Sequence, residues 1–120
     1  MLQRGAGVPQ SDAQAVRWFT RAAVQGDVRA QTSLGDCYAR GVGTSRNDTA
    51  ALEWFRKAAE RDGVSARVRL GLMYVEGRGV PLPDVTEGIA WLRLAADAGE
   101  LDAQLTLASM YGLGEHVPRN

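Results

Sequence analysis

Two side chains in this sequence stand out as candidates for chemistry. Cys37 could act as a nucleophile once deprotonated, and His116, the one histidine among 120 residues, could act as a base or a metal ligand. His116 has no matching cluster of Cys, His, Asp or Glu, and the chain has no recognisable set of nucleophile, base and orienting acid. We therefore expect no catalytic residues, no metal site and no cofactor.

The glycine-rich turns could offer a second kind of chemistry, because closely spaced glycines can cradle a phosphate. Residues 41–43 read Gly-Val-Gly, and residues 77–79 read Gly-Arg-Gly. Both segments follow predicted helices instead of strands, and both lack the third glycine or the Lys-Ser/Thr pair of a nucleotide-binding loop. We interpret them as turns.

These segments belong to a pattern that recurs every 36 or 37 residues. Trp18, Trp54 and Trp91 keep this spacing. The motif LGDCYARGVG at residues 34–43 returns as LGLMYVEGRG at 70–79 and, loosened, as LASMYGLGEH at 107–116. A fixed period of this length indicates stacked helical repeats.

The repeat also decides how Cys37 is interpreted. Met73 and Met110 occupy the equivalent position in the next two copies. A soft side chain that recurs in phase indicates packing, so Cys37 is predicted to be structural and not a reactive thiol.

Each period contains two segments with the spacing of an amphipathic helix. Glycines follow these segments, and capping residues precede them. The expected caps are Asp12, Asp48 and Asp84 for the second helix of each period, and Asp27, Ser65 and Asp102 for the first. We predict no strands and six helices, at about residues 12–25, 28–40, 48–62, 65–76, 85–98 and 101–113.

Small residues are predicted where the helices cross. They are Gly35, Gly71, Ala108 and the alanine pairs at 22–23, 58–59 and 95–96. A single helix pair cannot bury its apolar face alone, so neighbouring pairs must stack closely. The three tryptophans are expected to fill the space opposite the small residues.

The motif at 34–43, together with DTAALEWFRKAAERDG at 48–63, resembles the Sel-one-like repeat family, a relative of the tetratricopeptide repeats. The likeness covers essentially the whole chain and departs at Leu92, Ala108 and His116. It implies an all-α solenoid, a right-handed superhelix of antiparallel helix pairs whose first helices line a concave surface. It also implies an adaptor, mostly bacterial, that binds other proteins and has no shared catalytic motif.

We expect a single repeat domain over residues 1–120, with phases of roughly 1–28, 29–64, 65–101 and 102–120. Met1 is in phase with Cys37, so the chain is expected to begin inside a first helix, as a fragment of a longer array or a short natural piece of one. The helix at 12–25 then lacks its usual neighbour. Exposed Val16 and Phe19 would favour self-association.

The concave surface is predicted from positions that point away from the stack, by similarity to tetratricopeptide geometry. An apolar centre with a polar rim suits a peptide or helix ligand. Its expected centre is the strip formed by Val68, Leu72, Val75 and Leu105. The whole predicted groove consists of Arg29, Thr32, Asp36, Arg40, Val68, Leu72, Val75, Glu76, Leu105, Ser109 and Leu113.

The charge balance argues against two classes of partner. The 14 basic and 14 acidic residues cancel, so no global field attracts nucleic acid or an anionic membrane. We expect no nucleic-acid partner and no membrane partner. No secretory signal precedes the repeats, which predicts a cytoplasmic protein as given, or a periplasmic or secreted one if this is a fragment.

These observations favour a non-catalytic scaffold that binds a peptide or helix of another protein in the concave groove. Two alternatives remain open at this point. The chain could be a hydrolase or binder acting on a cell-wall-related ligand, or a purely structural module of a longer array.

Overall fold

The computed structural model describes the backbone of residues 8–113 and the side chains of residues 12–112. Within that range the chain forms six α-helices and no strands. They are α1 (Val8–Val24), α2 (Val28–Arg40), α3 (Asp48–Ala59), α4 (Val64–Glu76), α5 (Val85–Asp97) and α6 (Leu101–Leu113).

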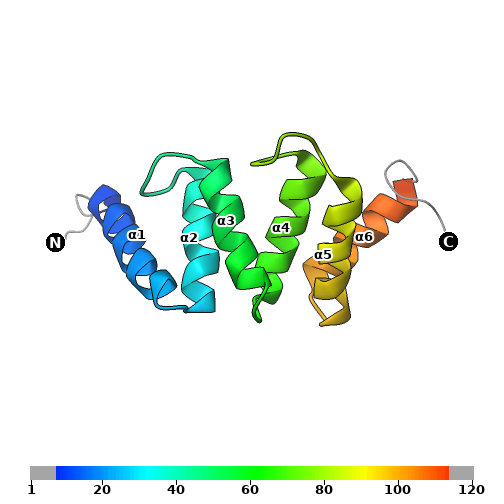
Figure 1. The fold of residues 1–120 in the computed structure, drawn as a ribbon, viewed down its shortest axis with the longest axis horizontal. Coiled ribbons are helices and arrows are strands. Elements are labelled where there is room, and N and C mark those ends of the chain that lie inside the picture. Colours follow the sequence, from blue (N-terminus) through cyan, green and yellow to red (C-terminus); the bar gives the residue numbers. More distant parts are fainter. Residues whose placement is uncertain (1–7, 114–120) are drawn as a thin grey trace.

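The helices stand side by side in a single row, with α1 and α6 at opposite ends (Figure 1). The molecule measures 56 × 27 × 25 Å along its principal axes. Short turns join α1 to α2, α3 to α4 and α5 to α6 along one edge, and longer loops join the other pairs along the opposite edge (Figure 1). The all-α solenoid of antiparallel helix pairs is confirmed.

Four of the six predicted helices agree with the structure to within one residue at both ends, and the other two differ at one end each. α1 begins at Val8, four residues before the prediction, with Pro9 in its first turn. The first turn tolerates proline because its N–H groups have no partner within the helix. α3 ends at Ala59, three residues early, where Gly63 N–H folds back to donate to the carbonyl of Ala58 at 2.9 Å.

The helix caps are partly those predicted. Asp27 and Asp84 cap α2 and α5, each accepting a hydrogen bond from a backbone N–H three residues on. For α3 the cap is Asn47 and not Asp48, which is the first helical residue. For α4 it is Gly63, without a side-chain bond, and Ser65 lies inside the first turn.

The remaining two predicted caps also lie inside helices. Asp12 falls within α1 because that helix begins early, and Asp102 falls in the first turn of α6. A carboxylate in a first turn still favours the helix through the macrodipole.

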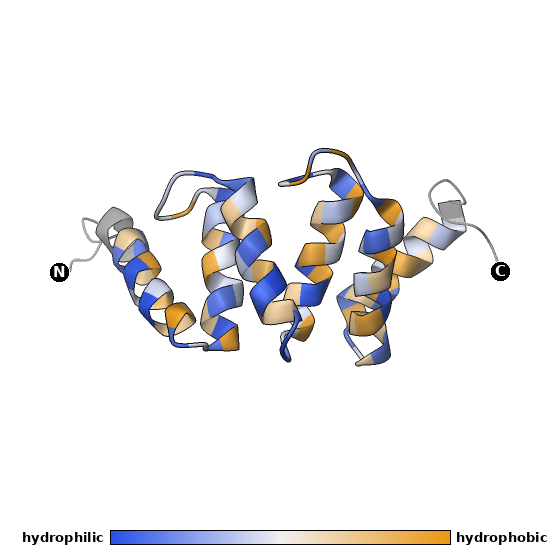
Figure 2. Ribbon diagram, in the orientation of Figure 1, coloured by the Kyte–Doolittle hydropathy of each residue, from blue (hydrophilic) through white to orange (hydrophobic). Residues whose placement is uncertain are grey.

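The core runs along the row in clusters between neighbouring helices. Both hydrophobic and hydrophilic residues occur along the helices (Figure 2). The largest fully buried side chains are Leu34, Phe55, Leu70 and Leu92, on α2, α3, α4 and α5 respectively. Side chains are therefore buried most completely in the central helices of the row.

The prediction that the tryptophans fill the space opposite the small residues is wrong for the glycines, but it holds for the alanine pairs, since Trp54 packs against the cluster of Ala23 and Trp91 against that of Ala58 and Ala59. A Cβ added to Gly35 would lie 2.5 Å from the Phe55 ring, and one added to Gly71 would lie 2.9 Å from Leu92 Cγ. The residue one position after each tryptophan therefore faces the glycine. The tryptophans project instead toward the preceding repeat.

Trp54 packs against the cluster of Ala23, Ala30 and Leu34, and Trp91 packs against the next cluster, which includes Leu70. Trp18 has no such cluster before it within the described residues, and 65% of its surface is exposed.

The prediction that Val16 and Phe19 are exposed on α1 is also wrong. Val16 and Phe19 are half-buried against the α1–α2 cluster, because they face α2. The most exposed large aromatic residue of this helix is Trp18.

Candidate functional site

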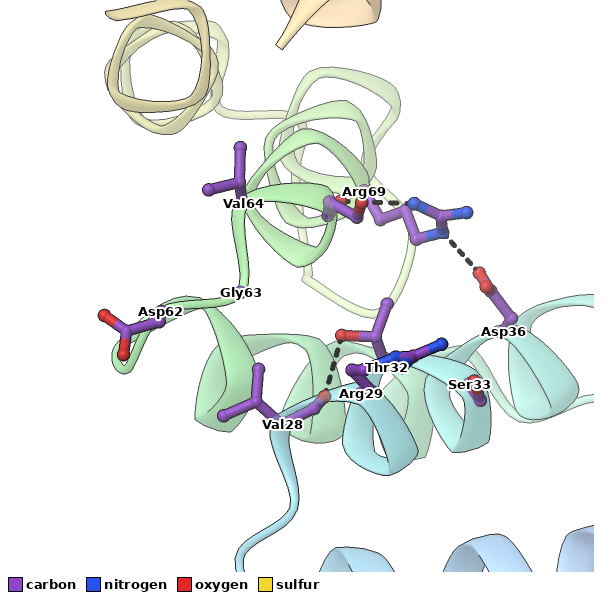
Figure 3. A pocket seen from close by; sticks show the side chains of 10 residues that line it. Val28, Arg29, Thr32, Ser33, Asp36, Asp62, Gly63, Val64 and Arg69 are labelled. Carbon is purple, nitrogen blue, oxygen red and sulfur yellow. Dashed lines mark hydrogen bonds and ion pairs between the residues drawn. The ribbon is translucent and has the colours of Figure 1, made fainter. Parts of the chain in front are cut away.

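Two hollows lie along the first helices of neighbouring repeats, α2 and α4. The first has a volume of about 360 Å³ and is shown in Figure 3. Its lining consists of Val28, Arg29, Thr32, Ser33, Asp36, Asp62, Gly63, Val64, Ser65 and Arg69. The second has a volume of about 220 Å³ and is lined by Asp36, Ala39, Arg40, Phe55, Arg69, Leu72, Met73, Glu76 and Arg78. We refer to the two hollows together as the α2–α4 groove.

An ion pair between Arg69 and Asp36 separates the two hollows, and both residues line both of them. Arg69 extends from α4 toward α2, where its Nε donates to Asp36 Oδ1 at 2.6 Å (Figure 3). Arg69 Nη1 also donates to the Ser65 carbonyl at 3.2 Å, which fixes the guanidinium over its own helix. The side chains are 41% and 31% exposed, so the pair contributes little to stability. The pair links α2 to α4 between the two hollows.

The rim of the groove carries charges of both signs. Arg29 and Arg40 are exposed on α2, Glu76 is exposed at the end of α4, and Asp62 is exposed just before it. Within residues 12–112, none of these four side chains forms an ion pair. They are therefore available to charged groups of a ligand.

The floor of the second hollow is apolar. Phe55 and Met73 are 1% and 3% exposed, and half-buried Leu72 lies beside them. An apolar floor under a charged rim can hold one hydrophobic side chain and orient its neighbours.

The structure brings together six of the residues predicted for the groove. Arg29 and Thr32 line the first hollow, Arg40, Leu72 and Glu76 line the second, and Asp36 lines both. The Thr32 hydroxyl donates to the carbonyl of Val28 at 3.1 Å, so it is turned toward its own helix.

The predicted apolar strip does not form a continuous surface. Val68 is only 7% exposed and belongs to the core cluster of α4, α5 and α6, and Val75 is half-buried against that cluster. Residues of α5 and α6 cover both valines. Leu105 and Ser109 are exposed on α6 but line neither hollow, and the Leu113 side chain lies outside the described ones.

Several groove residues were not predicted from the sequence, among them two arginines that form ion pairs there, Arg69 and Arg78. Arg69 directly precedes the motif residue Leu70, at a position where the other copies have Ser33 and Thr106. Arg78 stands between the turn glycines, where the first copy has Val42. In both cases a charge that departs from the repeat pattern was the available signal.

Arg78 closes the far end of the second hollow. Its Nη2 donates to Asp48 Oδ1 and to the Ala39 carbonyl, both at 2.8 Å, and thereby ties the α4–α5 loop to α2 and α3. Hydrogen bonds from Arg78 and then from Arg46 hold the pKa of Asp48 below its ordinary value.

Neither candidate for chemistry forms a reactive site. Cys37 is half-buried, and burial, followed by the nearby charges of Asp36 and Asp12, raises the pKa of its thiol. A raised pKa lowers the fraction of reactive thiolate. His116 lies outside the described residues. In the part of the chain that the structure describes, no group of three or more His, Cys, Asp or Glu could hold a metal ion.

No helix between residues 8 and 113 combines the length and the apolar character that crossing a bilayer requires.

The comparisons with solved structures give bacterial helical-repeat proteins. The chain is similar to c5321, described as a protective antigen of uropathogenic Escherichia coli with an SLR fold, at 37% identity and a TM-score of 0.84, covering 90% of this chain and 23% of c5321. It is similar to a Sel1 repeat protein from Oxalobacter formigenes at 35% identity and a TM-score of 0.79, covering 90% of this chain and 44% of that one. The chain thus spans less than half the length of either protein.

A third structure shares the fold at lower identity. Cysteine rich protein B (hcpB) of Helicobacter pylori is 20% identical, with a TM-score of 0.68, over 73% of this chain and 65% of its own. The comparison with curated proteins gives no match. The Sel1 repeat model matches residues 1–27, 28–63, 64–100 and 101–120. The chain therefore belongs to the Sel1 repeat family.

Proposed function

We propose that this chain is a non-catalytic adaptor that binds a peptide or helix of a partner protein in the α2–α4 groove. Sel1 repeat proteins are generally protein-interaction scaffolds, and the family is typically non-catalytic. The observation that supports this groove is the pair of hollows on either side of Arg69 and Asp36, with an apolar floor in one and unpaired charges around both.

The groove suggests which ligand would fit. One apolar side chain of the ligand would enter the hollow over Leu72 and Phe55. An acidic group beside it would approach Arg29 or Arg40, and a basic group would approach Glu76. Binding energy in such interfaces concentrates in a few buried anchors, while rim charges mainly orient the ligand and accelerate its association.

The two alternatives have less support. The hydrolase alternative would be revived by a turnover that His116→Ala abolishes, and His116 lies outside the described residues. A structural module of a longer array is compatible with the short share of c5321 and of the Oxalobacter protein that the chain covers. The groove variants below separate this alternative from the proposal, because an idle groove would tolerate them.

The test is selection of peptides from a displayed library on the chain, followed by fluorescence-anisotropy titration of a selected peptide. We expect the exposed substitution Arg40→Glu to weaken binding about tenfold, in the range of truncating one charge-assisted contact. Leu72→Asp should abolish binding, with circular dichroism to verify that the half-buried substitution leaves the helices intact. Arg17→Glu is the matched control, since Arg17 is exposed on α1, away from the groove.

Two results would contradict the proposed groove. The first is a library that yields no binder. The second is a selected peptide that binds Arg40→Glu as tightly as the unmodified chain, or that loses the same affinity with Arg17→Glu.

A further inference from the structure

The ion pair of the α2–α4 groove leaves part of its guanidinium unused. Arg69 Nε donates to Asp36 Oδ1 at 2.6 Å, and Arg69 Nη1 donates to the Ser65 carbonyl at 3.2 Å. Arg69 Nη2 makes no hydrogen bond to any residue between 12 and 112. A guanidinium donates through every one of its nitrogens, so Nη2 keeps its N–H groups for a ligand in the first hollow, which Arg69 lines.

A second arginine lines the first hollow from the other helix. Arg29 is exposed on α2, and its side chain forms no ion pair with residues 12–112. Of the two acidic residues in this lining, Asp36 is neutralised by Arg69. Asp62 lies on the far side of Gly63 from Arg69, with its carboxylate pointing away (Figure 3). The unused groups around Arg69 and Arg29 are therefore mainly N–H donors, which favour a negatively charged acceptor.

Neither arginine is part of the repeat pattern. Arg29 stands where the next two copies have Ser65 and Asp102, and Arg69 is likewise the only arginine at its repeat position. The other copies thus stack with different side chains at these positions. The two arginines are therefore not required for stacking, although they line the same hollow.

The first hollow lies at a fixed distance from the apolar floor of the second. Ser65 lines the first hollow and Leu72 lines the second, and both belong to α4. An α-helix rises about 1.5 Å per residue, so these two positions are about 10 Å apart along the helix. In a polyproline II segment, side chains three residues apart share a face and are separated by about 9 Å. An extended peptide can therefore place one side chain in each hollow.

We propose that the partner is an extended peptide with an acidic side chain three residues from its apolar anchor, and that Arg69 and Arg29 bind this acid in the first hollow. The inference rests on the proposed function, because it places the anchor in the second hollow over Leu72. Asp36 is then an internal competitor of the ligand, since it occupies one side of Arg69 and reduces the positive charge that the ligand acid meets. The balance between Asp36 and the two arginines sets the preference for acidic peptides.

The test compares two fluorescein-labelled forms of a peptide selected on the chain. One is the selected peptide, and the other carries the matching amide in place of its acidic side chain. We expect the amide form to bind the unmodified chain about tenfold more weakly, because it loses a charge-assisted contact. On Arg69→Gln and on Arg29→Gln the two forms should differ by less than about threefold, because a residue that distinguishes them is gone. Arg29 is exposed, so its variant keeps the test valid if Arg69→Gln disturbs the helices.

Asp36→Asn should act in the opposite direction. It removes the competing negative charge, so the acidic form should bind at least about threefold more tightly, while the amide form should change little. Arg46→Gln is the matched control. Arg46 is also an arginine paired with an aspartate, but it lines neither hollow, so the two forms should keep their full difference on this variant.

Three outcomes would overturn the acid-binding role of the first hollow. One is a set of selected peptides without an acidic residue at this distance from the anchor, or with a basic residue there, which would assign recognition to Asp36 and Asp62. Another is equal binding of the acidic and amide forms to the unmodified chain. The third is an undiminished difference between the two forms on both Arg69→Gln and Arg29→Gln.

Failure of this inference is distinguishable from failure of the proposed function. Peptides that lose affinity with Leu72→Asp and Arg40→Glu, but are indifferent to Arg69→Gln and Arg29→Gln, would leave the groove as the binding site and refute only its acid-binding end. A library that yields no binder would refute both.

Discussion

At the scale of single residues, the position one after each tryptophan decides how closely two helices approach. Phe55 lies against Gly35, and Leu92 lies against Gly71, whose added Cβ would also meet the Gly88 carbonyl at 2.8 Å. The smaller Leu92 and the extra Gly88 occur in the same helix, α5. A Cβ added to Gly88 would lie 2.6 Å from the Gly71 carbonyl oxygen, so α4 and α5 approach closely at these two glycines.

Gly35→Ala should destabilise the fold by about 1 to 3 kcal/mol, because its methyl group would overlap the buried Phe55 ring. The higher helix propensity of alanine offsets part of this cost. Gly112→Ala is the control, since a Cβ there meets nothing within 4 Å. Urea titration of both variants gives the comparison. Adding Phe55→Leu should recover part of the Gly35→Ala loss, and equal effects of Gly35→Ala and Gly112→Ala would refute the explanation.

At the scale of elements, hydrogen bonds between consecutive helices recur at equivalent positions of the repeats. Gln31, Arg67 and Gln104 occupy equivalent positions on the first helices, and each donates to the carbonyl of an alanine near the end of the preceding helix at 3.0 to 3.1 Å. Since the last carbonyls of a helix lack intrahelical donors, each tie satisfies a group that would otherwise need water.

A second repeated tie joins a second helix to the first helix that follows. Arg56 donates to the Tyr74 hydroxyl, and Arg93 donates to that of Tyr111. Both arginines also lie over the tyrosine rings. Thr20 and Tyr38 occupy these positions in the first pair, where Thr20 instead donates to the Val16 carbonyl. The α1–α2 pair therefore lacks this tie.

The ion pair between Asp48 on α3 and Arg78 in the α4–α5 loop depends on pH. Its pKa is lowered from the ordinary 3.8 by the Arg78 and Arg46 hydrogen bonds. A lowered folded-state pKa stabilises the fold above the ordinary value, and this contribution is lost as pH falls through the folded value. Asp48→Asn should therefore cost about 1 kcal/mol at neutral pH, and the difference should shrink progressively in acid below pH 4.

The measurement is the free energy of unfolding of both proteins at a series of pH values. Asp62→Asn serves as the control, because exposed Asp62 forms no ion pair among the described residues. If the difference between Asp48→Asn and the unmodified chain were the same at neutral and acidic pH, the ion pair would not be its source.

At the scale of the whole molecule, each helix contacts mainly its neighbours in the row (Figure 1). Stability in such arrays is distributed along the row and does not reside in one core. The fully buried large side chains lie on α2 to α5. Local opening of α1 or α6 therefore costs less free energy than opening of a central helix.

Amide hydrogen exchange should show this gradient. We expect α1 and α6 to exchange at least about tenfold faster than α3 and α4, through local opening. Equal protection of all six helices would instead indicate a single cooperative unit.

The sequence by itself determined the solenoid, because period, glycine turns and helix spacing are local signals repeated three times. It also placed Asp36, Arg40 and Leu72 correctly along one surface. Only the tertiary structure decided that Val68 is core and that Trp18 is exposed, because both depend on whether a neighbouring repeat covers the residue. The repeat pattern likewise could not predict that Arg69 and Arg78 form ion pairs in the groove. Their partners, Asp36 and Asp48, lie 33 and 30 residues away in the chain.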